Sequence, residues 1–250
     1  KQLGLEFFSS PAAVPIVIAD PSDTWSHNVF TFQQAAGQFA PRSVELIEQG
    51  PVKSVVRVTS EYNRSTLIQD FSLYAALDWI DVDVTVDWRE QHKMLKLRFP
   101  LNLSDVTAAF EIPYGHIERP ANGEEEPGQG WIDLTGISED NGSRCGLSIL
   151  NDGKYSFDVN ASSIGLTVLR SPIYAHHDPF VPEPDKRYSY IDQGIQRFRY
   201  TLLPHAGGWE EAAAVRRAAE LNQRPIALVT TIHPGRSEEH TSELQSHACI

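Results

Sequence analysis

Cysteine and methionine are scarce in this sequence of 250 residues, which contains only Cys145, Cys249 and Met94. Two cysteines cannot form a framework of disulfide bonds, and these two do not show the spacing of metal ligands. A reducing compartment is therefore the default, and we expect a cytoplasmic protein. Four Asn-x-Ser triplets would be glycosylation acceptors in a secreted eukaryotic protein and favour the opposite compartment. They begin at Asn63, Asn102, Asn141 and Asn160.

The sequence also lacks a long apolar run and a basic stripe. No window approaches about 18 consecutive apolar residues, so we expect no membrane span. The chain has 21 Lys and Arg against 33 Asp and Glu, a formal net charge of −12. Nucleic acids are bound largely through Lys and Arg, so this balance argues against a nucleic-acid partner and favours a neutral substrate. The hydrophobic fraction of 41% is that of a soluble globular protein.

Complete catalytic motifs are absent as well. The sequence has no Gly-x-Ser-x-Gly elbow, no phosphate-binding glycine loop and no His-Glu-x-x-His. The run His176-His177-Asp178 could suggest a metal site, but neighbouring residues point in different directions and no third ligand has a defined spacing. We therefore expect no catalytic residue and no bound metal ion in this chain.

Most of the chain alternates apolar and polar residues with period two, which is typical of strands with one buried face. In residues 79–88, Val82, Val84, Val86 and Trp88 share one face. Short turns such as Asp152-Gly153 separate many strands, which predicts an antiparallel β-sandwich. The other strands are predicted at 54–60, 66–73, 94–99, 146–150, 164–169 and 196–203.

The end of the chain departs from this pattern. Residues 209–221 are rich in Ala, Glu and Arg and contain no Pro or Gly, so they predict a helix. Residues 226–230 predict one more short strand. Residues 236–250 show neither period and resemble the translated read-through of a sequencing adapter, so we treat them as a non-native tail. Without this tail the chain has 20 Lys and Arg against 30 Asp and Glu, a net charge of −10.

The densest polar segment covers residues 114–131. Its first part carries Tyr114, His116, Glu118 and Arg119, and its second part is a Pro- and Gly-rich stretch with Glu124, Glu125 and Glu126. One interpretation is a solvated acidic loop. The other is a lip over a sugar pocket, where carboxylates accept hydrogen bonds from hydroxyls and Trp131 offers an apolar face. Adjacent glutamates in one flexible loop cannot fix the carboxylate separation that a glycosidase needs.

Two smaller polar clusters stand at strand ends. Asn151, Asp152, Lys154 and Tyr155 occupy a tight turn between two strands. Asp152-Gly153 is sufficient chemistry for the turn but does not explain Lys154 and Tyr155. Arg170 directly follows the apolar strand 163–169. Its guanidinium is either a surface anchor or a group aimed at a ligand.

These segments together resemble a known family. In chain order they are VPIVIADPSDTWSH, VDWREQHKMLKLRFP, IPYGHIERPANGEEEPGQGWIDLTG, GLSILNDGKYSFDV, LTVLRSPIY and FRYTLLPHAGGW. They are similar to the C-terminal β region of the glycoside hydrolase family 38 α-mannosidases, and the first is similar to bacterial members. The resemblance extends over residues 14–233.

The resemblance implies an all-β antiparallel supersandwich, galactose-mutarotase-like, with one short helix near the C-terminus. It also implies that the parent is a retaining exo-α-mannosidase acting on α-mannoside oligosaccharides. In that family a divalent metal, usually zinc, and the catalytic carboxylates belong to an N-terminal domain followed by a three-helix bundle. The chain begins at Lys1 rather than Met, and we expect that this catalytic half is missing. Oligomerisation is possible.

We expect residues 44–235 to form the β-sandwich domain and residues 1–43 to be a leading segment that packs on the missing bundle. The chain alone should be inactive. By position, the family's substrate-rim role would be carried by Arg170, His116, Glu118, Arg119, Asn151, Asp152 and Tyr155. The alternatives are a stand-alone carbohydrate-binding β-sandwich without catalysis and a purely structural domain.

Overall fold

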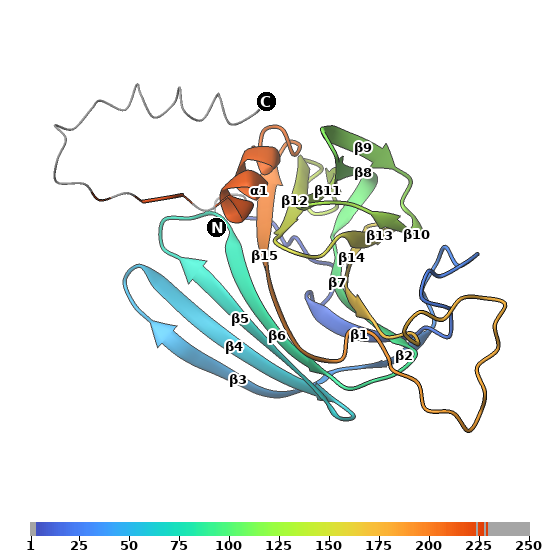
Figure 1. Cartoon of the computed structure of the whole chain (residues 1–250). Helices are drawn as coiled ribbons and strands as arrows, with labels where there is room; N and C mark the ends of the chain where they lie inside the picture. The colour runs from blue at the N-terminus through green and yellow to red at the C-terminus, as the bar shows by residue number, and fades with distance from the viewer. Residues whose placement is uncertain (1–3, 224, 228, 230–250) are drawn as a thin grey trace.

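A computed structural model describes residues 4–223, 225–227 and 229. These residues form two antiparallel sheets and one short helix (Figure 1). The elements in chain order are β1 (Val14–Ala19), β2 (Ala35–Gln38), β3 (Ala40–Gln49), β4 (Lys53–Tyr62), β5 (Ser65–Tyr74), β6 (Ile80–Trp88), β7 (Lys93–Pro100), β8 (Leu103–Ile112), β9 (Gly115–Arg119), β10 (Asn122–Pro127), β11 (Trp131–Ser138), β12 (Arg144–Asn151), β13 (Ser156–Asn160), β14 (Ser163–Arg170), β15 (Gly194–Ala206) and α1 (Ala214–Asn222).

Strands that are distant in the sequence are neighbours in both sheets. The six-stranded sheet has the order β10-β13-β14-β7-β1-β2, and the nine-stranded sheet has the order β3-β4-β5-β6-β15-β12-β11-β8-β9. Six of the seven predicted strand segments lie within strands of the structure, and the seventh, 79–88, matches β6 except for Trp79. The prediction of an antiparallel all-β fold with one short helix near the C-terminus is confirmed. No helix in the described part of the chain has the length and hydropathy of a membrane span.

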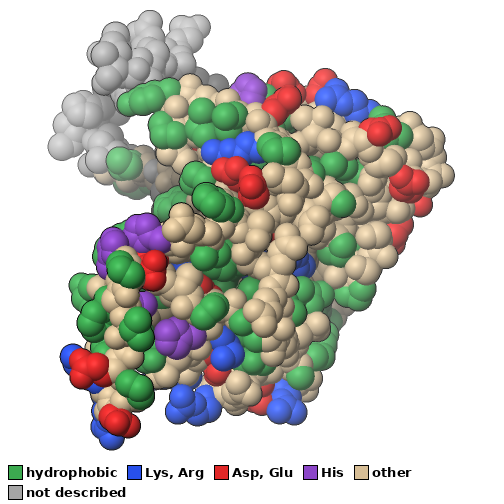
Figure 2. All heavy atoms as spheres, turned by 90° about the vertical axis from the view of Figure 1, so that its right-hand side faces the viewer, with side chains coloured by type: hydrophobic (Ala, Val, Ile, Leu, Met, Phe, Trp, Pro, Cys, Tyr) green, Lys and Arg blue, Asp and Glu red, His purple; other side chains and the backbone are tan. Residues whose placement is uncertain are grey.

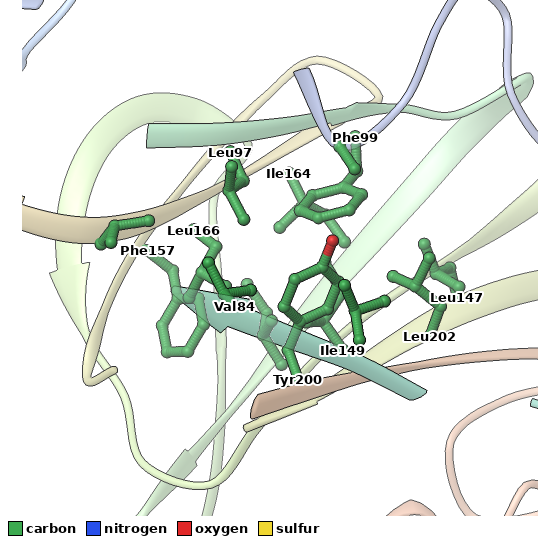
Figure 3. Close-up of a cluster of buried hydrophobic side chains, with 14 of the residues drawn as sticks. Val84, Leu97, Phe99, Leu147, Ile149, Phe157, Ile164, Leu166, Tyr200 and Leu202 are labelled. Atoms are coloured by element: carbon green, nitrogen blue, oxygen red, sulfur yellow. The ribbon is translucent and has the colours of Figure 1, made fainter. Parts of the chain in front are cut away.

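The main core lies between the two sheets (Figure 3). Leu97 and Phe99 of β7 face Val84 of β6 and Tyr200 of β15, and the rings of Phe99 and Tyr200 lie 5.7 Å apart. Tyr200 is completely buried, and its hydroxyl donates a hydrogen bond to Gln69 Oε1 at 3.2 Å. Burial raises the pKa of this phenol far above its usual range. The core therefore holds one polar contact that ties β15 to β5.

A second, smaller core covers the other face of the nine-stranded sheet. Ala214 and Ala218 of α1 pack against Trp131 and Leu150. Small side chains on the helix allow it to lie close to these large ones. The helix begins at Ala214 rather than at Trp209 as predicted, because residues 209–213 form turns and Ala213 has a φ of 52°. A residue in this left-handed conformation cannot continue an α-helix.

Three other expectations from the sequence have different outcomes. In the predicted strand 226–230, the described residues 226, 227 and 229 belong to no strand, and Leu228 and Thr230 lie outside the described residues. The tail 236–250 lies outside them as well. Residues 1–43 contain β1 and β2, and β1 pairs with β7 inside the six-stranded sheet. Their packing on a helical bundle stays a prediction, and residue 43 falls within β3.

The glutamate-rich segment is a strand and not the loop that its composition indicates. β10 pairs with β13 in the six-stranded sheet, whereas β9 and β11 on either side of it belong to the nine-stranded sheet. The chain thus crosses from one sheet to the other and back. Gly123 permits this course because its φ of 82° is costly for a residue with a Cβ.

A buried ion network holds β10 in that position. Lys96 of β7 is fully buried, and its ammonium group contacts the carboxylates of Glu125 and Asp158. Arg98 also contacts Asp158, so two cations face two carboxylates. Glu125 accepts further hydrogen bonds from Ser156 Oγ at 2.6 Å and from the hydroxyl of Thr167. The network joins β7, β10, β13 and β14 of one sheet.

Replacing Lys96 should therefore cost far more stability than replacing a surface cation. Lys96→Met leaves the Glu125 and Asp158 carboxylates buried with less compensation, and we expect a loss of about 3–5 kcal/mol in the free energy of unfolding. Arg42→Met is the matched control, because the pair of Arg42 and Glu61 is solvent-exposed and should contribute less than about 1 kcal/mol. Urea unfolding followed by tryptophan fluorescence measures both. Equal losses in the two variants would contradict a structural role for the network.

Candidate functional site

A groove lies between α1 and the loops that follow β10 and β12, with a volume of about 550 Å³. Its described lining combines side-chain amides, one carboxylate and one exposed aromatic ring, that of Tyr155. Amides both donate and accept hydrogen bonds, and an aromatic face suits the apolar side of a sugar ring. The lining residues are Glu111, Gly128, Gln129, Gly130, Asn151, Tyr155, Val215, Ala218, Ala219, Asn222 and Gln223.

Asn151 fixes the wall of the groove formed by the β12–β13 turn. Its Nδ2 donates a hydrogen bond to the carbonyl of Gln129 at 3.1 Å, and its Oδ1 accepts from the N–H groups of Gly153 and Lys154 at 3.0 and 2.6 Å. Its backbone carbonyl accepts from Asn222 Nδ2 of α1 at 3.0 Å. The side chain of Asn151 thus joins the two loops, and its backbone carbonyl joins them to the helix. The side chain positions the groove rather than pointing free into it.

Gly130 and Glu111 line the groove next to Asn151, whose N–H donates to the Gly130 carbonyl at 2.8 Å. The carboxylate of Glu111 accepts a hydrogen bond from the Gly130 N–H. A Cβ on Gly130 would lie 3.0 Å from Glu111 Oε2 and 3.2 Å from Asn222 Nδ2, so a larger residue would push into the groove. A Cβ here would therefore displace the ends of the Glu111 and Asn222 side chains by a few tenths of an ångström.

In the rest of the β12–β13 turn, the ring of Tyr155 is free, whereas Asp152 and Lys154 form hydrogen bonds within the chain. The Tyr155 side chain is exposed beside the groove, while its carbonyl accepts a hydrogen bond from Gly128 N–H at 2.9 Å. Asp152 Oδ1 accepts from the Arg199 N–H at 2.8 Å and so supports β15. Lys154 donates to Gln196 at 3.1 Å, and burial lowers the pKa of its ammonium group although nearby carboxylates act to raise it.

The three candidates on β9 do not line this groove. His116 and Glu118 are exposed on an edge strand, and the His116 ring lies 4.6 Å from that of Trp209. Arg119 donates to the carbonyl of Pro127, its Nε lies 3.3 Å from Glu126, and its guanidinium covers the ring of Phe110. Arg119 therefore fastens the end of β10 to β9.

Arg170 lies in a different region, where the loop after β1 meets the long loop between β14 and β15. Its Nε and Nη2 donate to Asp20 at 2.8 and 3.1 Å, and Nη2 also donates to Ser22 Oγ at 2.7 Å. Asp20 is completely buried. The guanidinium also contacts the carbonyls of residues 23 and 24 and stacks over Phe32. Arg170 anchors the two loops to each other, and its role at a substrate rim stays a prediction.

The same region contains a group that sequence reasoning missed. Asp23, His27 and His177 can each offer a ligand atom, and these atoms lie within 4.8 Å of one another. The sequence places His177 next to His176 and Asp178, but the fold places it beside residues of the loop after β1. The only signal in the sequence is the spacing of four residues between Asp23 and His27, because the third member comes from a distant loop, between β14 and β15.

The Asp23 carboxylate is the most constrained member of this group. Oδ1 accepts from the N–H groups of Trp25 and His27, both at 3.1 Å, and Oδ2 accepts from the Asp178 N–H at 3.0 Å. His27 Nδ1 lies 2.5 Å from Oδ2. Burial acts to raise the pKa of this carboxyl, but the hydrogen bonds from Asp178 and His27 outweigh it and hold the pKa below its usual range.

Comparison with known proteins identifies relatives for most of the chain. The family described as Glycosyl hydrolases family 38 C-terminal domain matches residues 8–187. Alpha-mannosidase G of Dictyostelium discoideum is 27% identical over 84% of this chain and 19% of its own length. Alpha-mannosidase 2C1 of Mus musculus is 32% identical over 66% of this chain and 15% of its own length. The chain thus spans less than a fifth of these curated relatives.

Solved structures agree in fold. A protein in the Glycosyl Hydrolase Family 38 from Enterococcus faecalis superposes with a TM-score of 0.74 and 16% identity, covering 95% of this chain and 31% of that one. An alpha-mannosidase from Enterococcus faecalis V583 gives a TM-score of 0.72 and 15% identity over 94% of this chain and 30% of that one. At this identity the likeness concerns the fold alone.

The bond between Arg170 and Asp20 should be measurable as an energetic coupling. In a double-mutant cycle of Arg170→Met and Asp20→Asn, the second change should cost little once the first has removed the partner. We expect a coupling energy of about 1–3 kcal/mol from urea unfolding. Strictly additive losses would show that the two side chains do not support each other.

Proposed function

The chain belongs to glycosyl hydrolase family 38, in which it matches the C-terminal domain, and on that premise we propose that its parent is a retaining exo-α-mannosidase. The parent would release terminal α-mannosyl residues from oligosaccharides, and this chain would supply the β domain and part of the substrate rim. The curated relatives support the proposal because they are named as alpha-mannosidases. The groove beside α1 is the observation that carries the role of this chain.

The chemistry of the groove fits sugar binding better than bond cleavage. A retaining glycosidase needs two carboxyl groups about 5–5.5 Å apart. Among the described lining residues, Glu111 alone carries a carboxylate, and it already accepts the Gly130 N–H. The groove donors also do not fit zinc, because side-chain amides replace the imidazoles and thiolates that zinc prefers. We therefore assign the cleavage step to the catalytic half of the parent.

The binding role can be stated at the level of single groups. The exposed ring of Tyr155 would cover the apolar face of a mannosyl unit, and the exposed amides of Gln129 and Gln223 would exchange hydrogen bonds with its hydroxyls. The locked turn at Asn151 keeps Tyr155 in place without a ligand, which lowers the entropy lost on binding.

The outer part of the nine-stranded sheet offers a surface for the catalytic half. β3 is exposed along nearly its whole length and carries Val44, Leu46 and Ile47 among the exposed large hydrophobic residues. Val52 and Leu73 on the neighbouring strands and turn extend this apolar surface. Exposed apolar area of this kind commonly marks an interaction site. We assign it, together with residues 1–43, to contacts within the parent, and we place the parent in the cytoplasm in keeping with the free buried thiol of Cys145.

Activity assays separate the enzyme from the stand-alone binding module. A protein containing this chain and an upstream catalytic domain should release mannose or aryl alcohol from an aryl α-mannoside, and a chelator should abolish the release. The 250-residue chain alone should show no turnover at the same concentration. Turnover by the chain alone would overturn the division of labour. A parent that binds mannosides but never cleaves them would support the binding module.

Two tyrosine substitutions test whether the groove binds substrate. Tyr155→Ala in the full-length parent should lower kcat/KM for a manno-oligosaccharide about five- to tenfold, since an aromatic stacking contact contributes about 1 kcal/mol. Tyr174→Ala is the control, because Tyr174 is also exposed but does not line the groove. If both variants keep wild-type kcat/KM, the groove is not part of the substrate rim.

A further inference from the structure

We propose that Asp23, His27 and His177 form a binding site for one divalent transition-metal ion of the zinc class. Asp23 and His27 lie in the loop after β1, and His177 lies in the loop between β14 and β15. The two imidazole rings are 4.5 Å apart, and their possible ligand atoms lie within 4.8 Å of each other and of the carboxylate. Ligands of one zinc ion stand about 2.0–2.2 Å from the metal, so these atoms, which lie within 4.8 Å of one another, must move closer together to share one ion.

Asp23 prepares His27 to act as a ligand. The carboxylate can only accept hydrogen bonds, so His27 Nδ1, which lies 2.5 Å from Oδ2, carries the proton. The lone pair of the neutral ring then resides on Nε2. A carboxylate that fixes the tautomer and orientation of a ligand histidine is the usual arrangement around zinc. Direct contact of Asp23 with the ion would instead require this hydrogen bond to open.

His177 is held beside His27 by contacts between the two loops. The N–H of the next residue, Asp178, donates to Asp23 Oδ2 at 3.0 Å. Thr24 Oγ1 donates to the carbonyl of Ile173 at 2.8 Å, and the Thr24 N–H donates to that of His176 at 3.1 Å. With the Arg170 anchor described above, these bonds fix the spacing of the two histidines before any ion arrives, which lowers the entropic cost of binding.

The site is open to solvent. Asp23 is buried while His27 and His177 are exposed, so the ion could enter from outside and keep water in its remaining positions. In Figure 2 histidine side chains gather on one part of the visible face, beside hydrophobic side chains. The exposed indole of Trp25 lies 5.5 Å from the His177 ring and 6.3 Å from the His27 ring. It provides an optical reporter within the site.

The donor set selects the class of ion. Two imidazoles, one of them oriented by a carboxylate, are typical of zinc, and imidazole also binds Co²⁺, Ni²⁺ and Cu²⁺. Magnesium and calcium prefer sites made only of oxygen ligands. This proposal replaces the expectation from the sequence that the chain binds no metal, and it does not depend on the substrate of the parent.

The test uses the 250-residue chain after treatment with EDTA and dialysis. Titration with ZnCl₂ in a calorimeter should show one strong site, and Cu²⁺ should quench the part of the tryptophan fluorescence that Trp25 contributes. His177→Ala and His27→Ala should each weaken zinc binding about 10- to 100-fold. His177→Ala is the more informative change, because it leaves the bond between Asp23 and His27 in place.

His176→Ala is the matched control. It removes the neighbouring histidine, whose Nε2 lies 2.6 Å from the carbonyl of Phe180 and which is not a member of the group. This variant should bind zinc like the wild type. Any weak binding at other histidines is the same in all variants and does not affect the comparison. His177→Ala and His176→Ala should keep the wild-type Tm in EDTA, whereas His27→Ala also loses its hydrogen bond to Asp23. Zinc should raise the Tm of the wild type and of His176→Ala only. The absence of a strong zinc site, or equal zinc binding in all variants, would overturn the proposal. The three residues would then only hold the two loops together.

Discussion

The ion network around Lys96 is the constraint on which the six-stranded sheet depends. A lysine ammonium group without solvent is tolerated only where opposite charges surround it, and here Glu125 and Asp158 supply them from two other strands. The attraction draws the acidic segment out of the loop that its composition favours and into β10. β10 in turn holds the segment after β1 through the hydrogen bond from Glu125 N–H to the Phe30 carbonyl at 2.7 Å. One buried cation thus organises both a sheet edge and the approach to the histidine loops.

The strands could be predicted from the sequence because they depend on the local alternation of apolar and polar residues. Val82, Val84 and Val86 alternate with polar residues, and the structure buries that face without exception. The acidic strand could not be read in the same way. Lys96 stands in an apolar run and Glu125 in a polar one, and nothing local indicates that they meet. Likewise the helix start at Ala214 is set by the turn at Ala213, which packing imposes and composition does not reveal.

The candidate site shows the same division between local and long-range causes. Asn151 and Tyr155 lie together at the groove because a tight turn joins them, and the sequence Asp152-Gly153 predicts that turn. The meeting of Asp23 with His177 depends on the course of two loops that are distant in the sequence. The resemblance to the mannosidases indicated which segments matter, but only the fold distinguishes a side chain that braces the scaffold, such as Arg170, from one whose ring remains free, such as Tyr155.

The position of β3 at the end of the nine-stranded sheet has a further consequence. Among the described strands β3 pairs with β4 alone, so the backbone amides and carbonyls along its other side are available to another strand. The charges of Arg42, Glu45 and Glu48 along this edge oppose indiscriminate growth of the sheet, which is a common protection of edge strands. If the chain is produced without a domain that covers this edge, the backbone groups of β3 remain available for pairing. Its association with other copies then depends more strongly on ionic strength than that of a protein in which β3 is covered.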